Sequence, residues 1–272
     1  MLGDRVRCSS PIVTSMLTMM LAGCGIVTEP PVPGSGKVTS ENRTLDSFSS
    51  ISVALGADVD VRKGDATTVT ITTDDNLLPR IRSVVADGQL KIDADGNLAP
   101  TKRIKVAITT PSVSSFSIAG SGVIKIEQLT GPKTSVSIAG TSDITTAVAA
   151  DEFTADIAGA GTVNATGTAK KVAVSIAGSG DIQTNGIAAD AASVEIAGSG
   201  TVSVHANTSL DVSIAGSGDV RYSGSPADIK QSIAGSGTVS QMPAATQTTA
   251  PPAESLSDQP GSTTDAASPA AP

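Results

Sequence analysis

The 272-residue chain has almost no aromatic side chains: it holds no tryptophan, one tyrosine and three phenylalanines. Exposed rings are the usual platforms on which proteins stack sugar rings or nucleotide bases. A strong glycan-stacking groove is therefore not expected. The net charge of −8 also argues against a nucleic-acid partner, because no basic stripe is present to neutralise phosphates.

Cysteine is scarce as well, since Cys8 and Cys24 are the only two in the chain. If Cys8 is removed with an export signal, Cys24 is the only cysteine left and no intramolecular disulfide can form. Disulfides would persist in an exported protein. Without an intramolecular disulfide, a packed aliphatic interior must stabilise the folded state.

Residues 1–24 have the form of an export signal, in which a short basic start precedes an apolar stretch over residues 11–21. That stretch is too short to span a bilayer as a helix. It ends in Leu21-Ala22-Gly23-Cys24, which resembles the lipobox of bacterial lipoproteins. The resemblance implies cleavage before Cys24 and acylation of this residue, and several acyl chains would make the anchor stable.

We therefore expect an exported protein whose partner is the membrane, through the lipid on Cys24. Gly25 follows the cysteine, so the aspartate that signals inner-membrane retention is absent. In a Gram-negative host this favours the outer membrane, with the side that the domain faces left open. Residues 24–37 are rich in proline and glycine and predict a flexible tether, and residues 242–272 predict a disordered polar tail.

The most informative positive feature is a repeat that returns seven times to the string Ile-Ala-Gly. The steps between neighbouring isoleucines are 18 to 20 residues, which predicts a stacked repeat architecture. These isoleucines should form one buried ladder: Ile118, Ile138, Ile157, Ile176, Ile196, Ile214 and Ile233.

Within one repeat, aliphatic and small or polar residues alternate before a Gly-x-Gly corner, as in residues 172–182. Alternation predicts a strand with one buried face, and glycine supplies backbone conformations that other residues avoid. An antiparallel meander of hairpins could use the same unit. We favour a single-stranded parallel β-helix with rungs of about 19 residues, because identical residues recur at identical positions and Asn-Gly or Asp-Gly hairpin turns are missing from the repeats.

Acid and threonine alternate at one position after the corner, where Asp143, Asp181 and Asp219 are 38 residues apart each time. In a rung ladder this places the carboxylates two rungs apart, at about 10 Å. A calcium site is the functional alternative, but carboxylates at this separation cannot share one ion. The short string Asp93-Ala-Asp95-Gly-Asn97 has some likeness to a calcium loop, and its spacing favours a turn.

No catalytic constellation is visible. The single histidine, His205, lies at a strand edge and is expected at the surface. No serine occupies a nucleophile-elbow motif, and the basic residues of the repeats share no rung position. We therefore expect no catalytic, metal or cofactor site and no enzymatic activity.

Residues 38–115 are rich in β-strand patterns but lack the repeat, and they include an Asp87-Gly88 hairpin signal. Their motifs, together with the Gly-Ser-Gly corners, resemble the bacterial auto-transporter adhesin, head GIN domain family: Glu41-Asn-Arg-Thr-Leu45, Asp60-Val-Arg-Lys-Gly-Asp65, Asp74-Asp-Asn-Leu-Leu-Pro79 and Ile104-Lys-Val106. The resemblance covers about residues 38–240. It implies an all-β fold, a pectin-lyase-like β-helix preceded by a non-repetitive β-rich segment, and brings no catalytic residues.

The sequence thus predicts three parts after the signal peptide of residues 1–23: a tether (24–37), a β-helical domain (38–241) and a tail (242–272). The expected function is a non-enzymatic, structural or adhesin-like module of the cell envelope, with an envelope protein or a glycan as ligand. A polysaccharide-binding or polysaccharide-cleaving β-helix and a periplasmic stress or assembly factor are the alternatives. The open strand edges at the end of the stack invite association, which the polar tail is expected to hinder.

Overall fold

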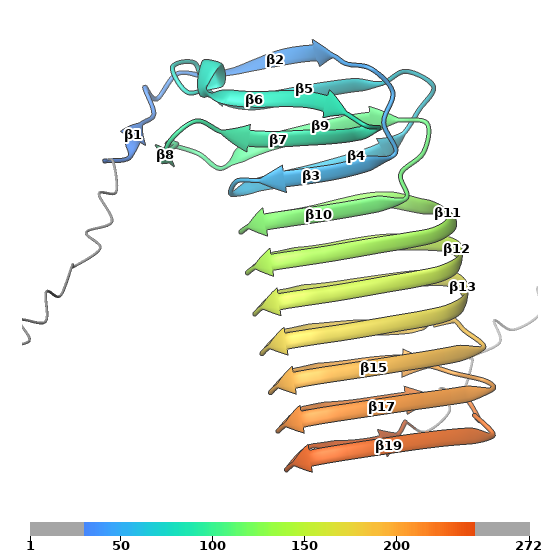
Figure 1. Cartoon of the computed structure of the whole chain (residues 1–272). Helices are drawn as coiled ribbons and strands as arrows, with labels where there is room; N and C mark the ends of the chain where they lie inside the picture. The colour runs from blue at the N-terminus through green and yellow to red at the C-terminus, as the bar shows by residue number, and fades with distance from the viewer. Residues whose placement is uncertain (1–29, 243–272) are drawn as a thin grey trace, which may run out of the picture.

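The computed structural model describes residues 30–242, which form a flattened parallel β-solenoid with an added β segment at its N-terminal end (Figure 1). The N-terminal segment comprises nine strands and one short 3₁₀ helix: β1 (Val32–Pro33), β2 (Val38–Thr44), β3 (Ser50–Ala54), β4 (Ala57–Lys63), β5 (Thr68–Asp74), η1 (Leu78–Arg80), β6 (Ile81–Ala86), β7 (Gln89–Ala94), β8 (Leu98–Ala99) and β9 (Ile104–Thr110). The repeats follow from Ser115 onward.

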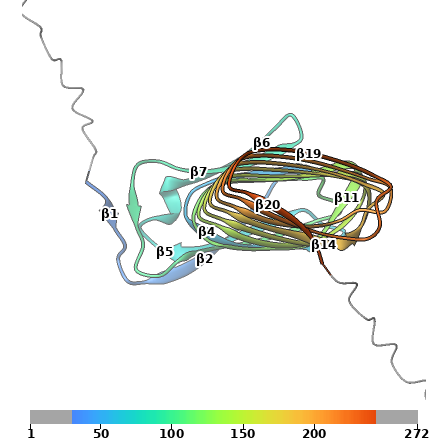
Figure 2. The same cartoon turned by 90° about the horizontal axis from the view of Figure 1, so that it is seen from below.

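Each turn of the solenoid carries one strand on each of two faces, and the turns stack as flattened rings (Figure 2). The first three long strands run from one face round the rung onto the other: β11 (Val123–Gly140), β12 (Asp143–Gly159) and β13 (Thr162–Gly178). The remaining strands each belong to one face: β10 (Ser115–Gly120), β14 (Asp181–Ala188), β15 (Ala191–Gly198), β16 (Thr201–His205), β17 (Ser209–Gly216), β18 (Asp219–Ser223), β19 (Asp228–Gly235) and β20 (Thr238–Gln241).

Neighbouring turns pair in parallel and in register, so that Ile118 lies beside Ile138, Ile138 beside Ile157 and Ile157 beside Ile176. This pairing confirms the parallel β-helix and excludes the meander of hairpins. The period of about 19 residues is the length of one complete turn, which explains why like residues recur at like positions.

The glycine corners are required by the close stacking of the turns. Gly178 has φ 137°, and a Cβ placed on it would lie 2.3 Å from the carbonyl oxygen of Gly159 in the preceding turn. Gly180 is similarly close to the carbonyl of Gly161 and to the side chain of Ile157. A side chain at either position would therefore push two rungs apart or bend the backbone.

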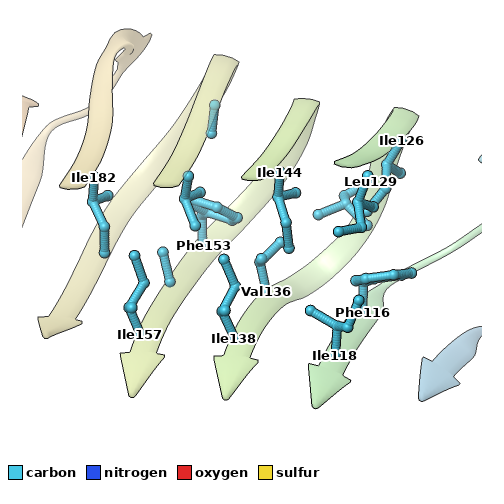
Figure 3. Packing of buried hydrophobic residues seen from close by; sticks show 14 of the residues in the cluster. Phe116, Ile118, Ile126, Leu129, Val136, Ile138, Ile144, Phe153, Ile157 and Ile182 are labelled. Atoms are coloured by element: carbon cyan, nitrogen blue, oxygen red, sulfur yellow. The ribbon is translucent and has the colours of Figure 1, made fainter. Parts of the chain in front are cut away.

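The aliphatic side chains of both faces fill the space between them, as the close view in Figure 3 shows. Six of the seven repeat isoleucines are at most 2% exposed. The expectation of a fully buried ladder is wrong at Ile233, which is 42% exposed. Ile233 lies on β19, the last strand of its face, and no described strand follows to cover it.

The N-terminal end of the solenoid is closed. β3 and β4 pair in parallel with β10 and β11, and the antiparallel strands β2 and β6 lie furthest from the repeats. The Arg43 side chain reaches from β2 to the carbonyl oxygens of Leu78 (3.2 Å) and Ile81 (2.7 Å). With Leu77 and Leu78 buried at this end, the segment covers the first rung of the solenoid. The expected Asp87-Gly88 turn joins β6 to β7, with φ 52° and 72°.

Part of the predicted tether is bound to the domain, which corrects the expectation that residues 24–37 are flexible throughout. β1 pairs with β8, and the buried Asp74 carboxylate accepts hydrogen bonds from the backbone of Gly36 (2.9 Å) and Thr101 (2.8 Å) and from the Thr101 hydroxyl (2.6 Å). The Thr101 contacts, with that of Gly36, hold the pKa of Asp74 below its ordinary value. Ser35 donates to Asp75 in the same clamp.

The centre and the last position of the isoleucine ladder provide a matched test of this interior. Ile176→Ala should lower the free energy of unfolding by about 2–5 kcal/mol, because it removes buried apolar surface and leaves a cavity. Ile233→Ala, at the same repeat position, should cost well under half as much because that side chain is partly in water. Urea denaturation of both variants measures the difference. Equal losses would contradict an open last rung.

Candidate functional site

One face of the solenoid presents a regular array of small outward side chains, which we call the serine face. It is formed by the outward residues of β10, β15, β17, β19 and the second halves of β11, β12 and β13, in three columns that run along the stack. The columns are Ser115, Ser135, Thr154, Ala173, Ser193, Asp211 and Lys230; Ser117, Ser137, Asp156, Ser175, Glu195, Ser213 and Ser232; and Ala119, Ala139, Ala158, Ala177, Ala197, Ala215 and Ala234.

The serine face is flat because its rungs are in register and most of its side chains are short. Neighbouring rungs are about 4.8 Å apart, and hydroxyls in adjacent rungs can hydrogen-bond, as do Ser115 and Ser135 at 2.9 Å between their Oγ atoms. Such a surface offers many equivalent donors and acceptors and little apolar area. It suits repeated weak polar contacts with an extended partner.

Two acids interrupt the serine column at Asp156 and Glu195, with Ser175 between them. They line a shallow hollow of about 210 Å³ together with Thr154 and Ser193. Burial raises the pKa of Asp156, because neighbouring atoms exclude part of the water that would stabilise its charged form. This is the one place on the serine face where an ionisable group is both recessed and perturbed, within the part of the chain that the structure describes.

The opposite face carries the alternating acid and threonine column. The register places Asp143 beside Thr162, then Asp181, Thr201, Asp219 and Thr238. One rung that carries threonine thus lies between successive aspartates. Thr238 donates a hydrogen bond to Asp219 (2.5 Å). The alternation of aspartate and threonine thus keeps the carboxylates of this column apart. Carboxylates two rungs apart cannot bind one shared ion.

A second hollow, of about 390 Å³, lies on the same opposite face where the N-terminal segment meets the first repeat. Asp58, Asp60, Lys105 and Lys125 surround it, and Val123 forms part of its floor. A hydrogen bond from Arg62 lowers the pKa of Asp60, and Lys125 adds to this effect. Asp58 is 3.3 Å from Arg103. Both aspartates of this hollow are therefore paired with arginines from outside its lining, Asp60 with Arg62 and Asp58 with Arg103.

The remaining residues singled out from the sequence are not brought together. Half-buried His205 contacts Ser223 (3.0 Å) and Asn207 (3.1 Å) through its two ring nitrogens. Asp93 pairs with Arg82 at 2.8 Å. Cys24 and the lipobox residues Leu21, Ala22 and Gly23 lie outside the described residues.

Two features are absent from residues 30–242. No group of three or more His, Cys, Asp or Glu side chains is placed to hold a metal ion there. Within the same range, no helix has the length and apolar character needed to cross a membrane.

The clamp around Asp74 is the feature that sequence reasoning missed. In the sequence, the string from Asp74 to Pro79 stood out only as one of the family motifs, and the short helix η1 begins within it. The available signal was an acid at the end of a buried strand, followed at once by Asp75 and Asn76. Asn76 completes the clamp by accepting from Ser35 (2.9 Å) and donating to Pro33 (2.8 Å).

Comparison with known proteins agrees with this architecture. Residues 47–226 match the family model described as "Putative auto-transporter adhesin, head GIN domain". The match covers well over half of the chain, which therefore belongs to this family. A search of curated proteins gives no match.

Several solved structures share the fold. A putative adhesin from Bacteroides fragilis is 25% identical, covers 78% of this chain and 100% of its own, and superposes with a TM-score of 0.72. A putative adhesin from Parabacteroides distasonis is 28% identical with the same coverages and a TM-score of 0.60. A protein from the same species, described as a putative lipid binding protein, is 24% identical, with coverages of 79% and 100% and a TM-score of 0.63. The last similarity concerns the fold alone.

The perturbed carboxyl on the serine face predicts a pH-dependent stability effect. Because the pKa of Asp156 is higher in the folded than in the unfolded chain, the folded chain binds more protons, and stability falls as the pH rises above the unfolded value of about 4. Asp156→Asn should therefore raise the urea midpoint at pH 7 relative to wild type. This gain should be absent at pH 3, where both forms of the residue are neutral.

Ser175→Asn, in the same column one rung further along, is the matched control because it introduces the same amide without removing a charge. Its effect on the urea midpoint should not differ between pH 3 and pH 7. If Asp156→Asn destabilised the protein at pH 7, the carboxylate would have a stabilising partner and the predicted desolvation would be wrong.

Proposed function

We propose that this chain is a non-enzymatic lipoprotein of the cell envelope that presents its solenoid as an adhesin-like interaction module. The observation that carries the proposal is the serine face, a flat array of repeated hydroxyl and methyl groups. Membership of the adhesin-like family supports the same conclusion. The ligand that fits such a surface is an extended polar partner, either an envelope protein or a glycan chain.

The position of the N-terminus supports display from a membrane anchor. The first described residue, Pro30, lies only six residues after Cys24, and residues 32–36 are hydrogen-bonded to the closed end of the solenoid. The serine face and the strands that continue it form a run of ten successively paired strands from β6 to β19 within the larger sheet, which spans about 43 Å at 4.8 Å per step. An anchor at Cys24 would hold the closed end near the membrane.

A polysaccharide-cleaving enzyme is the second candidate, and one observation favours it. Asp156 and Glu195 are two rungs apart, or about 9.6 Å, which is close to the separation of the two carboxyls in inverting glycosidases. The raised pKa of Asp156 would suit a general acid. The open, shallow form of the hollow and the lack of exposed aromatic rings on the serine face favour the non-enzymatic proposal.

The anchor is tested by mass spectrometry of the N-terminal peptide of the protein purified from its host membrane. We expect Cys24 as the first residue, with a diacylglycerol thioether and an acylated amino group. Cys24→Ala should abolish cleavage and acylation. An unmodified Cys24, or cleavage at another bond, would contradict the lipoprotein proposal.

The adhesive role is tested on intact cells with variants that add bulky, charged side chains to one face of the solenoid. Ser193→Arg/Ser213→Arg adds two bulky cations to the serine face, and Asn164→Arg/Gln183→Arg adds the same charge to the opposite face. We expect protease to reach the domain on intact cells, and only the serine-face variant to reduce attachment to mucin-coated surfaces, by several-fold.

Three outcomes count against this role. A domain that protease reaches only after the outer membrane is opened would favour a periplasmic assembly or stress factor. Equal loss of attachment in both variants would show that adhesion does not depend specifically on the serine face. Turnover of an acidic polysaccharide that both Asp156→Asn and Glu195→Gln abolish would establish the enzyme.

A further inference from the structure

The two ends of the solenoid differ in how their strand edges are covered. At the N-terminal end, Arg43 and the buried leucines close the interior. At the other end, β19 pairs only with β17 and β20 only with β18 among residues 30–242. The outer edges of β19 and β20 thus present backbone N–H and C=O groups in two rows, one on each face.

The side chains of this last rung are a mixture of exposed apolar and polar groups. Ile229 is 38% and Ile233 is 42% exposed, although the same column is buried in every earlier turn. Two inward positions change to glutamine in this rung alone: Gln231 follows the valines of β13, β15 and β17, and Gln241 follows Val204 and Tyr222. Glutamine can pair with a second amide across an interface and can also remain in water.

The last rung is symmetric about its corner at Ser236. Ile233 on β19 and Val239 on β20 stand three residues before and three residues after Ser236, and both continue inward columns of the earlier turns. The inward residues Gln231 and Gln241 correspond in the same way, as do the outward residues Ser232 and Ser240. β19 runs toward the corner and β20 runs away from it.

We propose that this end is a docking surface for a second copy of the same chain, related by a two-fold axis that runs parallel to the strands. The rotation places β19 of one copy over β20 of the other, and their directions are then antiparallel. Both sheets continue across the junction, and the surface is self-complementary, as a two-fold interface must be.

The register that results matches like with like. Gln231 of one copy meets Gln241 of the other, Ser232 meets Ser240, Ile233 meets Val239, and Ala234 meets Thr238. None of these positions carries a charge, so no like charges face each other. The exposed Ile233 and the half-buried Val239 become the continuation of the interior. The Gln241 amide already donates to the carbonyl oxygen of Gly224 (2.9 Å), so the Gln231 amide of the second copy would donate to the Gln241 side-chain oxygen. Among the described residues, β20 ends at Gln241, so the paired positions of this register run no further on that strand.

The interface is small, which sets the expected strength. The open end measures roughly 26 Å along eight strand residues by about 10 Å between the sheets. About 260 Å² per copy is far below the roughly 800 Å² per partner of a standard interface, so the contact can only be weak and transient. We therefore expect a weak, reversible dimer, which closes at two copies because both open ends are consumed.

Disulfide trapping of the full chain tests the register directly. Chains with Ser232→Cys and chains with Ser240→Cys, mixed under mild oxidation, should form a covalent dimer, because directly opposed Cβ atoms in an antiparallel pair lie within disulfide reach. The matched control uses Ser213→Cys and Ser203→Cys, which lie in the same two columns on β17 and β16. This pair should give no dimer above the background of the wild-type cysteines.

Sedimentation velocity between 1 and 500 μM tests the association without cross-linking. Ser232→Asp/Ser240→Asp places like charges opposite each other and should weaken dimerisation at least tenfold. Ser203→Asp/Ser213→Asp should leave it unchanged. All four positions face outward, so the circular dichroism spectra should be those of wild type.

Three results would overturn the proposal. The first is a full chain that stays monomeric up to 500 μM. If a chain that ends at Pro243 dimerises while the full chain does not, the tail and not a second copy occupies the open edge. The second is equal trapping in the end and control pairs. The third is growth beyond the dimer, which requires a head-to-tail contact rather than a two-fold one.

Discussion

The contact between glycine backbones of successive turns is the constraint on which the rest of the solenoid depends. At Gly140, Gly159, Gly178, Gly198 and Gly216, a Cβ would lie within 2.1–2.3 Å of the glycine carbonyl of the preceding turn. The corner therefore closes only when the later of the two turns lacks a side chain there, as at Gly120, which stacks on the carbonyl of Leu55. This fixes the register of every strand that enters and leaves the corner, and with it the alignment of the isoleucine interior and the outward columns.

The corner also explains how a departure from the repeat is tolerated. Ser142 stands where most turns have the second glycine, and it is buried. Its hydroxyl donates to the carbonyl oxygen of Gly120 at 3.2 Å, so the added polar atom has a partner. The solenoid accepts a side chain at this position because a hydrogen bond offsets the crowding, whereas the neighbouring left-handed glycine offers no such solution.

Much of the fold could be predicted from the sequence because a repeat encodes its own long-range contacts. Once the period is known, the partner of Ile176 is the residue one period away, and the buried column follows without other information. The same logic failed at Ile233, since periodicity does not say where the stack ends. It also gave nothing for the clamp of Asp74 on Gly36 and Thr101, which joins segments that do not repeat.

The candidate site was predictable in composition but not in shape. The sequence shows that the repeat faces are built from serine, threonine, alanine and glycine. The hollow at Asp156 lies where the short side chains of Ala173, Ser175 and Ser193 stand between and beside two longer ones, Asp156 and Glu195. It depends on the pairing of Asp156 with Ser175 and of Ser175 with Glu195. Burial in that setting then raises the pKa of Asp156, a consequence that no single repeat contains.

The same stacking of turns creates both the packed interior and the outward columns, but it constrains their residues differently. This difference decides which residues can determine binding specificity. A change in an inward residue alters packing with the turns before and after it, so the interior is held to aliphatic residues of similar volume. An outward residue on the serine face is under no such demand, and serine at that column satisfies the fold at every rung. Asp156 and Glu195 are thus departures that packing does not require, and Asp156 carries a desolvation cost. The packing of the fold does not select acids at these two positions. Asp156 and Glu195 are therefore the residues of the serine face that can most directly distinguish one binding partner from another.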